Sequence, residues 1–180
     1  MRYLHIFITI FVASSLFAAD DPQISDFVNT ISNACKQQDL QAIRDHFDDL
    51  DVSKENLNQA TASWTAMMSG GYPEKGWTLT QISFVPIEIL KHRISDQEKG
   101  NMPETTRQSI EKSEQEGIQI YNQMTQAFFQ DGQYYKYNLK VFGFLLVTFT
   151  NGSSQTSRMF PIGYNPKGAI RFALLKETNG

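Results

Sequence analysis

The stretch Gln133–Thr150, with the sequence QYYKYNLKVFGFLLVTFT, contains the strongest structural signal in this chain. From Tyr135 to Phe149 the odd-numbered positions are aromatic or aliphatic, and Gly143 is the one gap in the series. The even-numbered positions change from polar residues at 136–140 to apolar residues at 142–146. Because successive side chains of a strand point to opposite faces, a period of two predicts a β-strand. We expect one buried face along its whole length and a second face that becomes covered in its C-terminal half.

The predicted strand is too long to stay flat in a small domain. At about 3.3 Å per residue, Gln133–Thr150 would extend roughly 60 Å, well beyond a usual strand. We therefore predict a bend at Gly143, because a glycine inside a strand often marks a bulge and can hold a positive φ. Val141, Leu145 and Val147 are predicted to lie in the core.

Two turns follow this strand and fold the C-terminal part into an antiparallel meander. Asn151-Gly152 is a strong signal for a two-residue hairpin, and the return strand is expected at Arg158–Tyr164. Asn165–Gly168 predicts a second turn. It precedes a last strand at Ile170–Leu175, where apolar residues alternate again.

The N-terminal half has the pattern of amphipathic helices. Asp21-Pro22 is a typical helix start, and apolar positions recur after it at helical spacing as far as Cys35. Asp39 and Ser53 are expected to cap a second and a third helix. Cys35 continues the apolar stripe, so we predict a core residue rather than a reactive thiol. It is the only cysteine, which excludes an intrachain disulfide.

The middle of the chain combines a strand with a long polar segment. The pattern of Trp77–Leu90 predicts a strand whose alternation slips between Leu79 and Ile82, and Pro86 favours an edge strand or a bulge. Lys91–Gly117 is the most polar part of the chain, and Pro103 is a suitable start for a helix within it. Ion pairs at i,i+4 spacing are expected on the exposed face of this helix, between Arg107 and Glu111 and between Lys112 and Glu116.

From Ile118 onward the sequence allows two structures. Ile118, Tyr121, Met124 and Phe128 have helical spacing, which predicts that the helix continues into the core. Asp131-Gly132 is a hairpin signal and favours a strand from Ile118 instead. In both cases helices come first and strands gather later, which is the order of an α+β domain.

Residues 1–19 have the order of an export signal, with Arg2, an apolar stretch at Leu4–Val12 and then small residues. We expect a mature chain of residues 20–180, forming one domain in the bacterial periplasm or secreted; an uncleaved anchor is the alternative. Cleavage removes Arg2 and no acidic residue, so the formal charge changes from −3 to −4. This acidic balance without a basic cluster argues against nucleic acid, and no second apolar run could cross a membrane.

The helical pattern of the first half resembles that of the nuclear transport factor two-like (NTF2-like) superfamily, which includes ketosteroid isomerases and SnoaL-type polyketide cyclases. The resemblance rests on Phe27-Val28, Ile31, Gln38-Asp39-Leu40, Ala42-Ile43 and Phe47, and on the long strand with its closing meander. It implies N-terminal helices on a strongly curved antiparallel sheet, which forms a cone around an apolar pocket. The family often dimerises through its sheet. Phe142, Phe144 and Leu146 would suit such an interface, unless a terminal helix covers them.

One acidic cluster could be taken for a metal site. His46 lies close in sequence to Asp45, Asp48, Asp49 and Asp51, and Asp49-x-Asp51-x-Ser53 matches the start of a calcium-binding loop. However, Lys54 and Ala60 stand where such a loop needs a glycine and a bidentate glutamate. We therefore expect a solvated connection between helices and no metal.

An isomerase would need a carboxylate as the base and a tyrosine or protonated acid as the oxyanion donor. Glu88 is the candidate base, and Tyr121, Tyr135 and Tyr137 are the candidate donors, although these tyrosines fit core packing equally well. Candidate ligand-binding residues are apolar and lie at helical spacing: Trp64, Met67, Met68 and Phe128. Core packing is the alternative for these side chains too.

No phosphate-binding glycine-rich loop, zinc motif or Ser/His/Asp spacing occurs in the sequence, and no cofactor is expected. We therefore predict an exported, non-catalytic domain that binds a small apolar ligand or a protein partner, with a homodimer through the sheet as one option. An isomerase- or cyclase-like enzyme is the alternative. A ligand-binding role predicts an apolar pocket, whereas an interaction role predicts a filled interior and an exposed binding surface.

Overall fold

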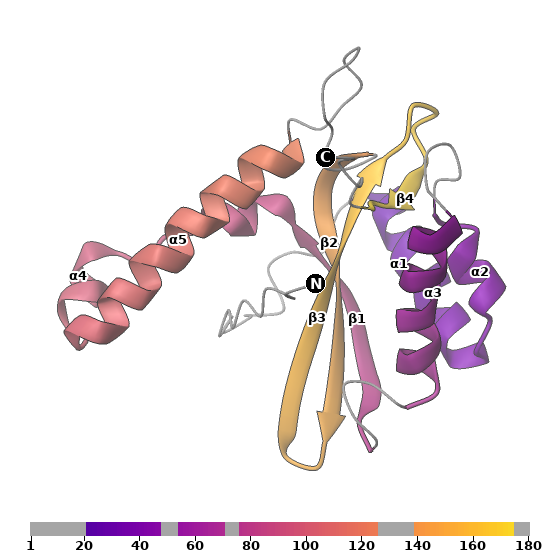
Figure 1. The fold of residues 1–180 in the computed structure, drawn as a ribbon, viewed down its shortest axis with the longest axis horizontal. Coiled ribbons are helices and arrows are strands. Elements are labelled where there is room, and N and C mark those ends of the chain that lie inside the picture. Colours follow the sequence, from indigo (N-terminus) through magenta and orange to yellow (C-terminus); the bar gives the residue numbers. More distant parts are fainter. Residues whose placement is uncertain (1–20, 48–53, 71–75, 126–138, 175–180) are drawn as a thin grey trace.

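The computed structural model describes residues 21–47, 54–70, 76–125 and 139–174. These residues form an α+β fold around one antiparallel sheet with the strand order β1-β2-β3-β4. Three N-terminal helices cover one side of the sheet, and a long helix projects from the other side (Figure 1). The predicted α+β class is confirmed.

The N-terminal helices are α1 (Pro22–Gln37), α2 (Leu40–Arg44) and α3 (Lys54–Met68). The predicted caps of the first two are confirmed: Gln23 N–H donates to Asp21 Oδ1 at 2.9 Å, and Ala42 N–H donates to Asp39 Oδ1 at 3.0 Å. The predicted Ser53 cap lies outside the described residues. Each cap satisfies a backbone N–H that has no partner within the helix.

The first strand, β1 (Thr78–Pro86), is an edge strand with a register shift between Leu79 and Gln81, where the sequence predicted a slip. It ends four residues before the predicted end at Leu90. A 3₁₀ helix, η1 (Ile87–Lys91), takes over after Pro86. Proline cannot donate a ladder hydrogen bond, which agrees with its place at the end of an edge strand.

The polar middle segment is helical. It contains the short helix α4 (Asp96–Gly100) and the long helix α5 (Glu104–Thr125), which begins after Pro103 as predicted. Because α5 continues through Ile118 to Thr125, the alternative of a strand from Ile118 is wrong. The hairpin signal at Asp131-Gly132 lies outside the described residues.

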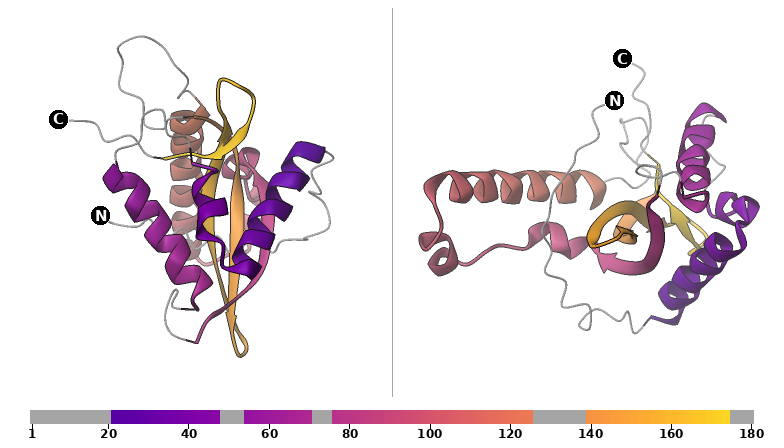
Figure 2. Two further views of the ribbon diagram at one scale, coloured as in Figure 1. Left: turned by 90° about the vertical axis from the view of Figure 1, so that its right-hand side faces the viewer. Right: turned by 90° about the horizontal axis from the view of Figure 1, so that it is seen from below.

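The meander consists of β2 (Lys140–Asn151), β3 (Ser154–Tyr164) and β4 (Ile170–Phe172), so the last strand is shorter than predicted. Gly152 and Gly168 hold positive φ angles of 59° and 78° in the two predicted turns, a conformation that glycine adopts without steric cost. Seen from below, β1, β2 and β3 curl strongly around one another (Figure 2).

The apolar residues form two clusters on opposite faces of the sheet. The first core lies between α1–α3 and the sheet, and the second core lies between the sheet, η1 and the end of α5. The buried members of the first core are Ile24, Phe27, Ile31, Ala34, Cys35, Ile43, Phe47, Trp64, Met67, Leu145, Val147, Phe149, Ile162, Ile170 and Phe172. Those of the second core are Ile87, Leu90, Met124, Leu139, Val141, Phe144 and Ala173.

The bend in β2 moves the buried residues from one core to the other. Val141 pairs with Gly163 and Gly143 pairs with Ile162, so Phe142 is an extra residue and forms a bulge. Val141 lies in the second core, whereas Leu145, two residues after the glycine, lies in the first. The predicted burial of Val141, Leu145 and Val147 is therefore confirmed, but the prediction of a single continuous face is wrong.

Gly143 is required at this bend because of a close contact rather than a special backbone angle. It is not among the described glycines with positive φ. A Cβ atom at this position would lie 2.3 Å from Cε2 of Phe84 and 2.8 Å from the carbonyl oxygen of Val85. The neighbouring strand β1 thus leaves room for hydrogen only.

Candidate functional site

The most distinctive part of the molecule is an arm formed by residues 92–117, which contains α4 and the first two thirds of α5. Figures 1 and 2 show this arm extending away from the sheet, with α4 beside the far end of α5. The residues of α5 that pack against the second core are Ile120, Tyr121 and Met124, all in its last turns. No residue of the arm belongs to either core among the described residues.

The arm leaves the body where α5 crosses η1 at Gly117. This glycine is buried, and a Cβ atom there would lie 2.5 Å from the carbonyl oxygen of Leu90. Two backbones can approach this closely only when one of the residues lacks a side chain. Gly117 therefore determines where the helix rests on the body.

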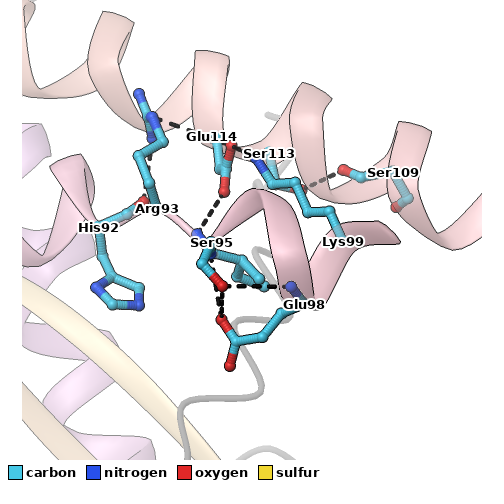
Figure 3. A network of polar contacts seen from close by, with 9 residues as sticks. His92, Arg93, Ser95, Glu98, Lys99, Ser109, Ser113 and Glu114 are labelled. Atoms are coloured by element: carbon cyan, nitrogen blue, oxygen red, sulfur yellow. Dashed lines mark hydrogen bonds and ion pairs between the residues drawn. The ribbon is translucent and has the colours of Figure 1, made fainter. Parts of the chain in front are cut away.

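A network around Glu114 joins the two helices of the arm (Figure 3). Its carboxylate accepts hydrogen bonds from Lys99 Nζ at 2.7 Å and from the backbone N–H of Ile94 at 2.8 Å, and Arg93 Nε lies 4.0 Å away. The side chains of Lys99 and Glu114 are each only 12% exposed. An ion pair so well shielded from water is stronger than an exposed one, because water screens it less.

The electrostatics of Glu114 agree with this geometry. Burial of the carboxyl raises its pKa, but the hydrogen bonds from Lys99 and Ile94 and the charges of Lys99 and Arg93 outweigh burial. The pKa of Glu114 is therefore held below its ordinary value. Glu114 is thus a stable anion that fastens α4 to α5.

A capping box orders the start of α4 (Figure 3). Ser95 Oγ accepts a hydrogen bond from the backbone N–H of Glu98 at 3.3 Å and donates to Glu98 Oε2 at 2.6 Å. The hydrogen bonds from the Ser95 hydroxyl and backbone N–H hold the pKa of Glu98 below its ordinary value. The five residues of α4 are therefore held by polar contacts at their start and by Lys99 near their end.

A polar groove of about 450 Å³ runs between α4 and α5. Its walls are stripes of residues at helical spacing from both helices: Asp96, Lys99 and Gly100 from α4, and Glu104, Arg107, Gln108 and Glu111 from α5. Arg107 pairs with Glu104 here, so the predicted Arg107–Glu111 pair is not formed; the predicted pair between Lys112 and Glu116 is present at 4.0 Å. The groove suits a polar or charged surface, not an apolar molecule.

Of the predicted catalytic residues, the structure describes Glu88 and Tyr121, which lie in η1 and on the neighbouring helix α5. Glu88 is exposed and lies in η1 rather than on a strand, which corrects the prediction for that segment. Tyr121 is half-buried on α5, where Lys91 Nζ donates to its hydroxyl oxygen at 3.3 Å and lies 4.4 Å from its ring centroid. Tyr135 and Tyr137 lie outside the described residues.

The predicted ligand-binding residues of α3 all contact the first core. Trp64 and Met67 are fully buried there, and Met68 is half-buried against it. The ring of Trp64 packs against Phe160 and Phe172, with centroid distances of 4.6 and 5.3 Å. Phe128 lies outside the described residues. These side chains fill the space between α3 and the sheet, and their contact with a ligand stays a prediction.

His46, from the acidic cluster, has structural contacts. Its Nδ1 lies 2.8 Å from the carbonyl oxygen of Ala42, and its ring packs edge-on against Phe27 at 5.3 Å. Its own carbonyl oxygen accepts a hydrogen bond from Phe172 N–H at 2.8 Å. In the part of the chain that the structure describes, no group of His, Cys, Asp or Glu side chains could hold a metal ion. Asp48, Asp49 and Asp51 lie outside that part.

The three residues proposed for a sheet interface have different surroundings. Phe144 is buried in the second core, and Phe142 packs against the first core and stacks on Tyr164 at 4.4 Å. Leu146 is half-buried. Phe144 is therefore covered by η1 and α5, whereas dimerisation through the rest of the sheet stays a prediction.

Comparisons with known proteins place the chain in no family. No protein-family model, no curated protein and no solved structure matches it. Within the described residues, the structure contains no helix with the length and apolar character needed to span a membrane.

The sequence did not predict the link between Lys99 and Glu114 or the role of Gly117. Lys99 and Glu114 are fifteen positions apart and lie in different helices, so no helical spacing connects them. Gly117 interrupts an otherwise polar helix, and this interruption was the one local signal of a special position.

Proposed function

We propose that this protein is an exported, non-catalytic interaction module that binds a protein partner through the groove between α4 and α5. The observation that carries the proposal is an ordered arm that adds nothing to either core. Ordering a residue costs about 1–2 kcal/mol of backbone conformational entropy. A body that did not need the arm could join η1 to the last turns of α5, which belong to the second core, by a short loop.

The contacts of the arm support a binding role. Glu114, Lys99 and the capping box of α4 hold both helices in place through polar contacts. A preorganised surface loses less entropy when a partner binds, which increases affinity. The charged walls of the groove favour a partner whose contact surface is itself polar and charged.

The proposals for the fold family and for the cellular location of the protein rest on patterns in the sequence. We propose a curved sheet of the NTF2-like type, on the basis of the helix-then-strand order and the long strand bent at Gly143. The export proposal rests on the charged, apolar and small-residue order of residues 1–19. Both are independent of the binding role of the arm.

Site-directed photocrosslinking in the cells that make the protein tests the binding role. A benzoylphenylalanine placed at Gln108, which lines the groove, should give one crosslinked adduct of defined mass with a partner protein. The matched control is Thr106, which is also exposed but lies about 160° around the helix from Gln108. It should give no such adduct.

A second variant connects the adduct to the geometry of the arm. Glu114→Gln in the Gln108 photocrosslinking chain removes the charge that joins α4 to α5, so the yield of the adduct should fall severalfold. The absence of an adduct at Gln108, or the same adduct at Thr106, would show that the groove does not bind a partner.

An isomerase- or cyclase-like enzyme is the alternative function, with Glu88 as the base and Tyr121 as the donor. The observation in its favour is the contact between Lys91 and Tyr121. Lys91 lies one turn after Glu88 in the 3₁₀ helix η1. The exposure of Glu88 counts against it, because a carboxylate base is normally activated by burial. Loss of turnover in both Glu88→Gln and Tyr121→Phe, with unchanged stability, would favour the enzyme.

A further inference from the structure

The two cations that line the groove of the arm are both neutralised by carboxylates of the arm itself. Lys99 Nζ donates to Glu114 Oε2 at 2.7 Å, and Arg107 forms an ion pair with Oε2 of Glu104. The second oxygen of Glu104 accepts a hydrogen bond from Gln108 Nε2 at 2.8 Å, so both of its oxygens are occupied. Neither cation is therefore left to attract an anionic partner.

Two carboxylates of the same groove are left over, one on each wall. Asp96 on α4 and Glu111 on α5 are exposed, and within the described residues neither has a hydrogen bond or an ion pair. The sequence predicted that Glu111 pairs with Arg107, but Arg107 turns to Glu104 instead. Three carboxylates thus face two cations in the groove, and the excess negative charge is divided between its two walls.

The arm as a whole has the same sign. Residues 92–117 contain four arginines and lysines and six aspartates and glutamates. All four cations lie in ion pairs with carboxylates of the arm: Arg93, Lys99, Arg107 and Lys112. Such a surface repels nucleic acid and anionic membranes and attracts a positively charged protein surface.

Recognition through exposed carboxylates needs more than one cation on the same partner. A single exposed ion pair strengthens an interaction by at most about fivefold, because water screens it. Two cationic side chains on one segment would act together on Asp96 and Glu111. Arginine suits this task best, since its planar guanidinium can pair with both oxygens of a carboxylate.

We propose that the segment bound in the groove is basic and carries two arginine or lysine side chains, one paired with Asp96 and the other with Glu111. This inference rests on the proposed binding role of the groove and adds the chemistry of the partner. The partner is a protein segment, because the two carboxylates lie on different helices and a chain presents two linked cations to both walls at once.

Capped model peptides test the charge preference before the partner is identified. Each peptide carries two arginines separated by one, two or three glycines, and each has a counterpart in which citrulline, the uncharged analogue of arginine, replaces both. In the ¹⁵N-labelled protein at low salt, an arginine peptide should move the amide signals of Asp96, Gln108 and Glu111 until they saturate. Its citrulline counterpart should not, and sodium chloride should weaken the arginine peptide because salt screens exposed charges.

Neutral variants assign the effect to the two carboxylates. Asp96→Asn and Glu111→Gln should each weaken binding of the arginine peptide by about two- to fivefold. The control is Asp26→Asn, which removes the same charge at an exposed position of α1, on the other side of the sheet, and should leave the affinity unchanged. In each variant the amide signal of Ile94, which donates to Glu114, shows whether α4 is still fastened to α5.

The outcomes separate this inference from the binding role itself. Equal shifts with arginine and citrulline peptides would overturn the basic partner, as would the absence of saturable shifts or tighter binding of a peptide with two glutamates. A Gln108 adduct in cells whose yield is unchanged by Asp96→Asn together with Glu111→Gln would keep the binding role and overturn the basic partner. Arginine peptides that bind as expected, without any cellular adduct at Gln108, would support the charge preference and overturn the role in cells.

Discussion

At the scale of single residues, Gly143 shows how a neighbouring strand restricts one position. Replacing it by valine would improve the intrinsic strand propensity. The Phe84 ring and the Val85 carbonyl oxygen nevertheless occupy the space that a side chain needs. We expect Gly143→Val to lower the free energy of unfolding by about 1–3 kcal/mol, as overpacked cores do.

Chemical denaturation of Gly143→Val against the parent measures this effect. Thr150→Val is the control, because Thr150 lies at the half-buried end of the same strand and should tolerate valine with little change. A Gly143→Val protein as stable as the parent would mean that β1 does not approach β2 as closely as the structure shows.

Cys35 is a second residue whose chemistry is determined by its surroundings. Burial raises the pKa of its thiol to about 11, so at pH 8 the thiol is protonated and only the rare thiolate can react. We expect iodoacetamide to leave Cys35 unmodified at pH 8 in the folded protein and to alkylate it once guanidinium unfolds the chain. Intact-mass measurement distinguishes the two states, and rapid alkylation of the folded protein would place Cys35 at the surface.

At the scale of elements, Gly117 and Gly100 make a matched pair within the arm. A Cβ atom at Gly117 would collide with the Leu90 carbonyl oxygen, whereas at Gly100 it would meet no atom within 4 Å. Alanine is about 0.5–1 kcal/mol better than glycine inside a helix. Gly100→Ala should therefore be neutral or slightly stabilising, and Gly117→Ala should lower the thermal midpoint. Equal midpoints for the two variants would show that α5 does not rest on η1 at Gly117.

The link between α4 and α5 depends on pH with a definite sign. The pKa of Glu114 is lower in the folded protein than its ordinary value of 4.5. The ionised Glu114 carboxylate therefore stabilises the folded protein fully above about pH 4.5. This stabilisation is lost as the pH falls through the lower pKa of Glu114 in the folded state. The amide NMR signal of Ile94, which donates to Glu114, should titrate with a midpoint below 4.5 and should lose this step in Glu114→Gln. A midpoint above 4.5 would contradict the network.

The elements also show what the sequence can predict. The caps at Asp21 and Asp39 and the turn at Asn151-Gly152 depend on adjacent residues, and these predictions were confirmed. The switch between cores at Phe142 was missed, because one extra residue reverses the facing of every residue after it, and only the pairing with β3 reveals it.

At the scale of the whole molecule, β2 contributes to both cores, which makes it the structural centre of the fold. Leu145→Ala should cost about 2–5 kcal/mol, because it leaves a cavity in the first core. Since β2 also carries Val141 in the second core, both cores should unfold together. Near-ultraviolet and far-ultraviolet circular dichroism should give coincident denaturation curves for this variant. Separated curves would show that the two sides of the sheet unfold independently.

The continuity of α5 has a mechanical consequence. One end of this helix lies in the second core and the other carries a wall of the groove, so a rigid rotation of the helix about its contact at Gly117 would move both ends. At 1.5 Å per residue the part from Glu104 to Gly117 is roughly 20 Å long, and a rotation of about 10° at the pivot would displace the groove by roughly 3–4 Å. The same rotation would displace Met124, which packs in the second core with Val141 and Phe144 of β2.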